Sequence, residues 1–489
     1  MGIIIKQSIR NSVISYAGAF LGAVNVLIIY ERMLDPEELG QIKYILATAF
    51  LFLPIVLLGA PSIQLRFFPR FESIEKRNHG ILGYAFALFL SGYILFLIFS
   101  LLFFRHLPDK FSENYILIIL LLVFLATSSI LTSYASSLRE ISIPAFFNNL
   151  WVKLGMGITV VLYFYNYLNF TGVKWGLIVV YAIGALGILI FVKTVNKLFL
   201  KPDFSILTKE NVKEIRSYSL YSAFGPIGVV FATQLDQFMV TELLSYESGG
   251  IYTIAVYIAS AFSIPMMAVF SIANPIISAA SDKNDYNNIQ SIYQKSSINL
   301  LVLGLLIMLL LWTNIDELFS LMSNSEVYSR GKYVVLIIGV AKIIDMSTSV
   351  NGAIIAHSRY YRFNLYIIMV LSVVNIVANI FLIKSLGIVG AAWATFLSLA
   401  CFNLGKLFFV KFRFGLQPFS KKSLIITFIA LSLFLLFQII PLSSMSFLLR
   451  ISFRAILIII VFFFAIYYLR ISEEMRNLII ETFKKLKNV

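Results

Sequence analysis

The sequence predicts an all-α membrane protein that crosses the bilayer many times. Of its 489 residues, 60% are hydrophobic and only 13% are charged, and the mean hydropathy is +0.89. Soluble domains carry about 25% charged residues, so this composition lies far outside their range. Apolar stretches of about 20 residues, the length that spans a hydrocarbon core, recur from one end of the chain to the other. We therefore expect a polytopic helical bundle.

The apolar stretches predict about 14 transmembrane helices. Their expected ranges are 11–31, 42–60, 80–104, 115–138, 146–167, 174–194, 218–243, 251–278, 297–314, 332–356, 363–383, 387–410, 424–441 and 447–469. An even number of spans places both ends of the chain on the same side of the membrane.

Lysine and arginine gather in alternate loops, and this asymmetry orients helices during insertion. With the N-terminus inside, the inner loops hold Lys6, Arg10 and the cations from Lys193 to Arg216, among others. The outer loops hold fewer cations, Lys43 among them. We therefore expect both termini to be cytoplasmic. The net charge of +15 is then mainly a topology signal and gives no support to nucleic-acid binding.

The two halves of the chain share a pattern. In each half an apolar span leads through a short acidic turn to a glycine, Gly40 in the first copy and Gly250 in the second. This predicts an N-lobe of six helices over residues 1–195, a basic cytoplasmic linker over 196–217 and a C-lobe of six helices over 218–415. Two further helices follow over 416–470, and a basic cytoplasmic tail over 471–489. Because the offset spans an even number of helices, we expect the lobes to be related by an axis along the membrane normal.

Ionisable residues inside the predicted spans are candidates for function, because placing a charge in the bilayer costs at least about 2.5 kcal/mol. Lys153 lies within the fifth span and either faces a wet cavity or reaches back to the headgroups. Asp236 lies near the middle of the seventh span and either lines a cavity, as a site for a coupling ion, or pairs with a cation such as Lys153. Lys342 and Asp345 stand three residues apart in the tenth span, and we expect them to pair with each other.

Three arginines stand at matching inner ends of predicted spans. Arg66, Arg139 and Arg359 follow the second, fourth and tenth spans. Each arginine alone fits the inward bias of positive charge and contact with anionic lipid. As a group they are candidates to collect an anionic substrate at the mouth of a cavity.

Small residues interrupt the apolar sequence where helices are expected to pack closely. Helices in lipid associate through close backbone approach, which requires small side chains on the contact face. The residues expected at such contacts are Gly18, Gly22, Gly387, Gly390, Ala391 and Ala394.

Cysteine and histidine give no sign of a metal or redox site. Cys401 is the one cysteine, and in its apolar stretch we expect a buried packing residue. The three histidines are isolated along the chain, so we expect no metal site and no cofactor.

Four segments resemble one transporter family. They are LDPEELGQIKYI (34–45), LGAPSIQLRFFPRFES (58–73), LDQFMVTELLSYESGGIYTIAVYIA (235–259) and SLGIVGAAWATFLS (385–398). These segments resemble the polysaccharide transport branch of the multidrug/oligosaccharidyl-lipid/polysaccharide (MOP) exporter superfamily, and within it the O-antigen type flippases. The resemblance covers nearly the whole chain.

This resemblance implies two six-helix lobes around a central cavity, with two C-terminal helices packed at the side. It implies that the protein moves an undecaprenyl-pyrophosphate-linked oligosaccharide, an O-antigen or capsule repeat unit, from the cytoplasmic to the periplasmic leaflet of a bacterial inner membrane. Alternating access would carry the headgroup across while the lipid tail stays in the bilayer. The expected partners are this cargo, membrane lipids and other polysaccharide assembly proteins.

The cargo favours a cationic cavity, because a lipid pyrophosphate carries about two negative charges that cannot cross bare hydrocarbon. Arg66, Lys153, Arg139 and Arg359 are therefore the candidate substrate-binding residues. Coupling to H⁺ or Na⁺ stays open, with Asp236 as the residue to test.

Two alternatives remain. A cation-coupled multidrug exporter of the same superfamily would typically have twelve helices, so the additional pair disfavours it. A membrane glycosyltransferase or polymerase would need a longer outer loop to carry its chemistry, and no loop presents a matched set of catalytic residues. We therefore expect a transporter and no enzyme.

Overall fold

The computed structural model describes residues 2–73, 77–195, 198–201, 218, 226–228, 230–231, 233–439, 446–477 and 480–481. Within these ranges all regular structure is helical, and eleven helices are long and apolar enough to cross a membrane. Most of the expected linker over 196–217 and the end of the tail lie outside them. The prediction of an all-α protein that crosses the membrane many times is confirmed.

Three predicted spans are not among these eleven helices. The span 218–243 is described only in part. The span 332–356 is broken into α17 (Lys332–Thr348) and α18 (Asn351–Ala356). The span 424–441 corresponds to α21 (Lys421–Ile439). The eleven helices match the other eleven predicted spans.

The chain divides into two compact units, Met1–Thr253 and Ile254–Val489, here called unit 1 and unit 2. Unit 1 contains α1 (Gly2–Val24), α2 (Glu31–Met33), α3 (Pro36–Leu57), α4 (Ala60–Phe71), α5 (Ile81–Leu102), α6 (Asp109–Glu113), α7 (Tyr115–Ser137), α8 (Ser142–Ala145), α9 (Val152–Phe164) and α10 (Phe170–Val195). Unit 2 contains α13 (Ser263–Asp282), α14 (Tyr286–Thr313), α15 (Ile315–Ser320), α16 (Ser325–Tyr328), α17, α18, α19 (Arg362–Leu386), α20 (Ile388–Phe414), α21 and α22 (Phe447–Tyr468). The helix α12 (Tyr246–Ala259) begins in unit 1 and ends in unit 2.

The central helix of unit 1 is α3, which its sequence caps at both ends. Asp35 caps its start in a reciprocal capping box, with the backbone N–H of Asp35 donating to Glu38 Oε2 at 3.1 Å, and Pro36 occupies the first helical position. Leu58 and Gly59 end the helix in the left-handed conformation, and α4 follows at once. α3 packs against α5 and α7, and most of its side chains are buried.

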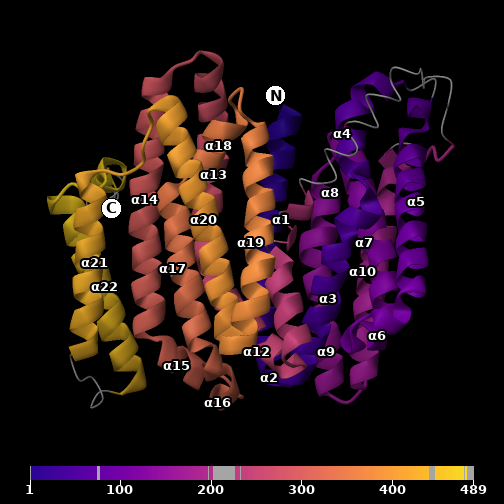
Figure 1. The fold of residues 1–489 in the computed structure, drawn as a ribbon, viewed down its shortest axis with the longest axis horizontal. Coiled ribbons are helices and arrows are strands. Elements are labelled where there is room, and N and C mark those ends of the chain that lie inside the picture. Colours follow the sequence, from indigo (N-terminus) through magenta and orange to yellow (C-terminus); the bar gives the residue numbers. More distant parts are fainter. Residues whose placement is uncertain are drawn as a thin grey trace. The chain divides into compact units, whose positions relative to one another are not determined.

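Two π-helical segments interrupt the helices of unit 1, Asn25–Tyr30 after α1 and Phe146–Trp151 before α9. α1 packs against the second of these segments, and α9 packs against α10. In unit 2, α14, α17 and α20 lie side by side, α19 packs on α20, and α21 and α22 pack on α14 at the edge of the row (Figure 1).

Candidate functional site

Two lysines of unit 1 lie close together within predicted membrane spans. Lys153 is in the first turn of α9, and Lys43 lies about two turns into α3, with its ammonium 5.9 Å from the centre of the Tyr30 ring. Both side chains are half-buried, and both lysines adjoin the Asn25–Tyr30 segment, Lys43 through the Tyr30 ring and Lys153 through its backbone carbonyl. Neither lysine forms an ion pair with a described carboxylate. Two like charges without a counterion in a region of low dielectric favour the binding of an anion.

Asn25 holds the backbone beside this lysine pair. Its side chain is 2% exposed, and Nδ2 donates to the carbonyl oxygen of Lys153 at 2.6 Å and to the Tyr30 hydroxyl at 3.3 Å. A Cβ on Gly157 would lie 2.8 Å from Asn25 Oδ1, so glycine leaves the room that this contact needs. π-helical turns such as Asn25–Tyr30 occur frequently at functional sites. The contact therefore couples the distorted first span to the backbone that carries Lys153.

The expectation that Lys43 lies in an outer loop is wrong. α3 begins at Pro36, so Lys43 lies inside the helix. The available signal was that Lys43 falls one residue inside the expected span 42–60. Its closeness to Lys153 depends on how α3 and α9 sit in unit 1, which no local pattern in the sequence reports.

The start of α3 crosses the start of α12 with backbone against backbone. A Cβ on Gly40 would lie 1.8 Å from the carbonyl oxygen of Tyr246, and a Cβ on Gly250 would lie 1.9 Å from that of Pro36. Tyr246 follows Pro36 and Gly250 follows Gly40 at the same distance along the sequence, so the two close approaches are reciprocal.

Tyrosines and glutamates surround this glycine crossing. The Tyr44 hydroxyl donates to Glu242 Oε2 at 2.5 Å, and the Tyr246 hydroxyl donates to Glu113 Oε2 at 2.9 Å. The Lys110 ammonium donates to the backbone carbonyl of Glu242 at 3.0 Å. Tyr44 is fully buried, so its hydrogen bond holds the carboxylate of Glu242 against α3. These contacts join several helix ends that we expect on the outer side of the membrane.

The predicted arginines are exposed, and they are divided between the two units. Arg66 in α4 lies 4.2 Å from the centre of the Tyr218 ring. Arg139 follows α7 in the left-handed conformation, with a φ of 65°. Arg359 lies in unit 2, between α18 and α19. Their grouping at one cavity mouth stays a prediction.

Asp236 is buried in unit 1, 8% exposed. Its Oδ2 accepts a hydrogen bond from the Tyr252 hydroxyl at 3.2 Å. The neighbouring Gln237 donates to the carbonyl of Gly249 at 3.0 Å and accepts from the Thr253 hydroxyl at 3.0 Å. Both hypotheses for Asp236, a coupling-ion site and a structural ion pair, stay predictions.

The break between α17 and α18 gathers buried polar groups in unit 2. Ser349 has a φ of 47° and a ψ of −124°, a conformation that L-residues rarely adopt. The hydroxyl of Ser349, Nδ2 of Asn351 and Nδ2 of Asn403 are buried without a hydrogen-bond partner in the described structure. The expectation of one continuous helix over 332–356 is therefore wrong at this point.

The expected ion pair between Lys342 and Asp345 is not formed within the described residues. α20, which packs against α17, carries a buried lysine of its own, Lys406. Lys406 is 9% exposed, and its ammonium lies 3.6 Å from the centre of the Phe402 ring. A Cβ on Gly352 would lie 3.1 Å from this ammonium. Lys406 falls within the expected span 387–410.

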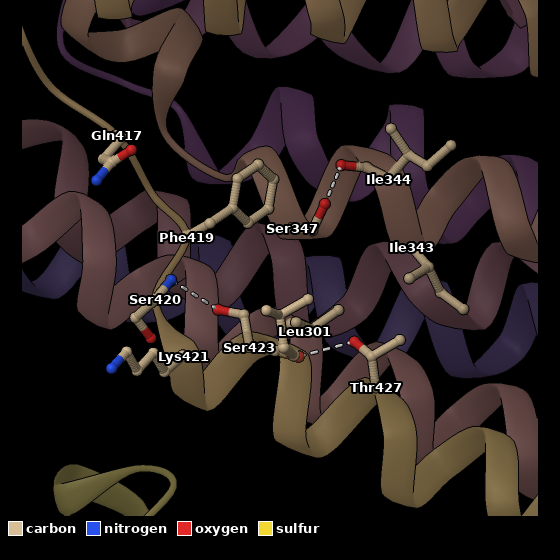
Figure 2. A pocket seen from close by; sticks show the side chains of 11 residues that line it. Leu301, Ile343, Ile344, Ser347, Gln417, Phe419, Ser420, Lys421, Ser423 and Thr427 are labelled. Atoms are coloured by element: carbon tan, nitrogen blue, oxygen red, sulfur yellow. Dashed lines mark hydrogen bonds between the residues drawn. The ribbon is translucent and has the colours of Figure 1, made fainter.

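A cavity of about 660 Å³ opens in unit 2 between α14, α17 and α21 (Figure 2). Leu301 and Ile343 contribute to its apolar wall, and Ser420, Lys421 and Ser423 line it at the start of α21. An apolar wall with one polar end suits a hydrocarbon chain. No pattern in the sequence predicts this cavity, because its lining residues come from segments far apart in the chain.

The small residues of 385–398 have two different roles. A Cβ on Gly390 would lie 1.9 Å from the carbonyl oxygen of Leu382, and Ala391 and Ala394 are fully buried. Gly387 forms the turn between α19 and α20 with a φ of 61°, and a Cβ there would meet no atom within 4 Å. Gly387 is therefore a turn residue rather than the packing residue that we expected.

Two further packing expectations concern α1 and α20. A Cβ on Gly18 would lie 2.7 Å from the carbonyl oxygen of Asn149, so α1 approaches the π-helical segment closely, and Gly22 is buried. Cys401 is exposed, so the expectation of a buried packing cysteine is wrong.

Comparison with known proteins identifies the class. Residues 4–281, more than half of the chain, match the family model described as polysaccharide biosynthesis protein, and the chain therefore belongs to this family. Residues 222–381 also match the MatE family model. The protein is a member of the MOP superfamily.

Individual relatives match less of the sequence. The probable low-salt glycan biosynthesis flippase Agl15 of Haloferax volcanii is 29% identical over 202 residues, which cover 41% of this chain and 41% of that protein. The structure of the lipid II flippase MurJ in an inward closed conformation has a TM-score of 0.75 at 15% identity, covering 95% of this chain and 100% of MurJ. The structure of an inward-facing MATE multidrug transporter has a TM-score of 0.63 at 12% identity. The match covers 81% of this chain and 94% of the transporter chain. At these identities the two structures show a shared fold.

Proposed function

We propose that this protein is a flippase that moves a lipid-linked oligosaccharide across the membrane by alternating access. The observation that carries the proposal is the half-buried pair of Lys43 and Lys153, which lacks a carboxylate partner in the described structure. A pyrophosphate supplies the negative charge that this pair lacks. The family match and the flippase among the relatives support the same function.

We propose as cargo an undecaprenyl-pyrophosphate-linked O-antigen or capsule repeat unit, carried from the cytoplasmic to the periplasmic leaflet of a bacterial inner membrane. In this proposal Arg66, Arg139 and Arg359 attract the headgroup at the inner side, and the lysine pair binds the phosphates. The lipid tail stays in hydrocarbon throughout. An inside-negative potential favours outward movement of uncompensated negative charge by about 2.3 kcal/mol per charge per 100 mV.

The glycine crossing of α3 and α12 is our candidate for the closed outer end. Release of cargo to the outside would then require the contacts of Gly40, Gly250 and Tyr44 to separate. There are two candidates for coupling to H⁺ or Na⁺: Asp236, and Asp345 together with Lys406. In both, a carboxylate lies inside a predicted membrane span.

The match to the MatE model over residues 222–381 favours a second candidate, a cation-coupled multidrug exporter. The two candidates differ in cargo chemistry. An anionic headgroup requires the lysine pair, whereas an organic cation would be repelled by it.

The test measures headgroup translocation of an undecaprenyl-pyrophosphate oligosaccharide in proteoliposomes. We expect Lys43→Ala and Lys153→Ala each to slow translocation at least about tenfold, because a charge-assisted hydrogen bond to phosphate contributes about 1.5–3 kcal/mol. Lys174→Ala is the matched control. Lys174 is another half-buried lysine of unit 1, in α10, where it contacts the Phe170 ring at 5.4 Å.

Equal rates in all variants would remove the lysine pair from the mechanism. If the wild type moves no oligosaccharide and instead expels organic dyes in exchange for cations, the multidrug exporter is the better assignment.

A further inference from the structure

α22 begins in unit 2 where a buried carboxylate meets two arginines. Glu317 of α15 is 7% exposed. Nη1 of Arg454 donates to Glu317 Oε1 at 2.8 Å and also to the carbonyl oxygen of Thr313. Nη1 of Arg450 lies 3.4 Å from the same carboxylate oxygen. One carboxylate faces two guanidinium groups, so this cluster has an excess of one positive charge.

The guanidinium of Arg450 makes no hydrogen bond within the described residues, although its side chain is only 29% exposed. Nε of Arg450 and Nε of Arg454 are both buried without an acceptor. A guanidinium presents five donors in a planar fork, and this fork matches the oxygens of a phosphate bidentately. Because Nε is buried, the donors that Arg450 can offer to a phosphate are those of Nη1 and Nη2 in its partly exposed side chain.

The neighbouring charges do not cancel this excess. Asp316 precedes Glu317 in α15 and is exposed, but it pairs one to one with Lys332 at 2.7 Å. Lys332 also lies over the Trp312 ring at 5.3 Å. This adjacent pair is locally neutral and provides a control.

Large apolar side chains surround the arginines on the surface of α22. Leu448, Leu449, Phe453 and Ile456 are all exposed. In a membrane protein such a surface faces the acyl chains of lipids. The excess positive charge thus lies next to the hydrocarbon, at the end of the span where headgroups lie.

We propose that Arg450, supported by Arg454, binds the phosphate of a membrane phospholipid whose chains lie along the exposed apolar residues of α22. By the predicted topology this lipid belongs to the outer leaflet. The proposal does not depend on which cargo the protein carries, because it uses only unit 2 and its surface.

The test uses the full chain purified in detergent and native mass spectrometry. Three probes are compared: phosphatidylglycerol, the diacylglycerol with the same chains, and inorganic phosphate as a competitor. We expect Arg450→Gln to weaken phosphatidylglycerol binding at least about tenfold, whereas Lys332→Gln binds as the wild type does. Diacylglycerol should bind weakly and equally to all three proteins.

Equal binding of phosphatidylglycerol to the wild type and to Arg450→Gln overturns the site. Diacylglycerol binding as tight as phosphatidylglycerol binding overturns phosphate recognition, and displacement by equimolar inorganic phosphate overturns the lipid as its source. Arg450→Lys keeps the charge without the fork, and we expect an intermediate affinity. If Arg450→Gln fails to fold, the comparison of Arg450→Lys with the wild type decides the proposal in the same way.

Discussion

Single residues show what a local sequence pattern can and cannot predict. Lys153 was identified correctly as a cation inside a span, because its position follows from the hydropathy around it. Its neighbour Lys43 was missed, because their closeness arises from the packing of unit 1 and from the Asn25 contact to the Lys153 backbone. Hydropathy identifies single charged residues inside spans. A binding site, however, requires several such residues to lie close together in the fold.

The lysine pair predicts opposite effects on stability and transport. Lys43→Met keeps the length of the side chain and removes one of two charges that repel each other in a poorly solvated place. We expect the cargo-free protein to gain about 1 kcal/mol in free energy of unfolding, while transport falls. Chemical denaturation in detergent measures this gain, with Lys174→Met as the control. A loss of stability in Lys43→Met would show that the charge is already compensated.

The glycine crossing makes Gly40 sensitive to a single methyl group. A Cβ there would lie 1.8 Å from backbone, the Tyr246 carbonyl, which cannot move aside as a flexible side chain can. We expect Gly40→Ala to lose about 1–3 kcal/mol in free energy of unfolding. Gly172→Ala in α10 is the matched control, because its nearest contacts are side-chain atoms at 3.3 Å. Equal stability of the two variants would mean that α3 and α12 can separate there without cost.

At the scale of the helix, hydropathy predicted where spans lie but not where they break. Ser349 and Val350, which lie between α17 and α18, are neither proline nor glycine, although Asn351 and Gly352 follow them directly. The spacing of Lys342 and Asp345 predicted an ion pair on one helix face, but within the described residues the two side chains form none. Helical spacing alone therefore does not decide whether two charged side chains pair.

The break predicts opposite results for glycine at two nearby serines. Ser349→Gly suits a positive φ that costs a serine about 1 kcal/mol or more, so we expect it to raise the free energy of unfolding. Ser347→Gly lies within α17 and should lower it by about 1 kcal/mol, because glycine is a poor helix residue. Thermal unfolding of both variants in one detergent measures the difference. Destabilisation by Ser349→Gly would show that the hydroxyl has a structural role that outweighs the strain.

For the whole molecule, the fold class followed from composition, whereas the repeat expected from spacing stays a prediction. Composition is carried by many residues, so errors at single positions do not affect it. The matching turns before Gly40 and Gly250 predicted two related halves of the chain, and in the structure a Cβ on either glycine would meet backbone of the other turn. The exposed Arg66, Arg139 and Arg359 remain ungrouped, because their grouping depends on the arrangement of the two units.

Alternating access requires the outer end of the protein to open during transport. If the glycine crossing closes the outer end, residues buried beside it must reach water during transport. Thr241 is fully buried, and its hydroxyl lies 2.2 Å from the place of a Cβ on Gly249. In a Cys401→Ser background we expect a membrane-impermeant maleimide to label Thr241→Cys only while cargo is being moved.

Two exposed positions calibrate this labelling in intact cells. Glu37→Cys, beside the start of α3, should react with the maleimide at all times, and Arg139→Cys, at a predicted inner end, should not react from outside. The reverse pattern for this pair would invert the predicted topology. Labelling of Thr241→Cys that stays absent during active transport would mean that the crossing of α3 and α12 is a fixed joint, and the outer opening would then have to form elsewhere. Labelling that follows transport would make the reciprocal glycine contact the part of the fold that the repeat uses to open.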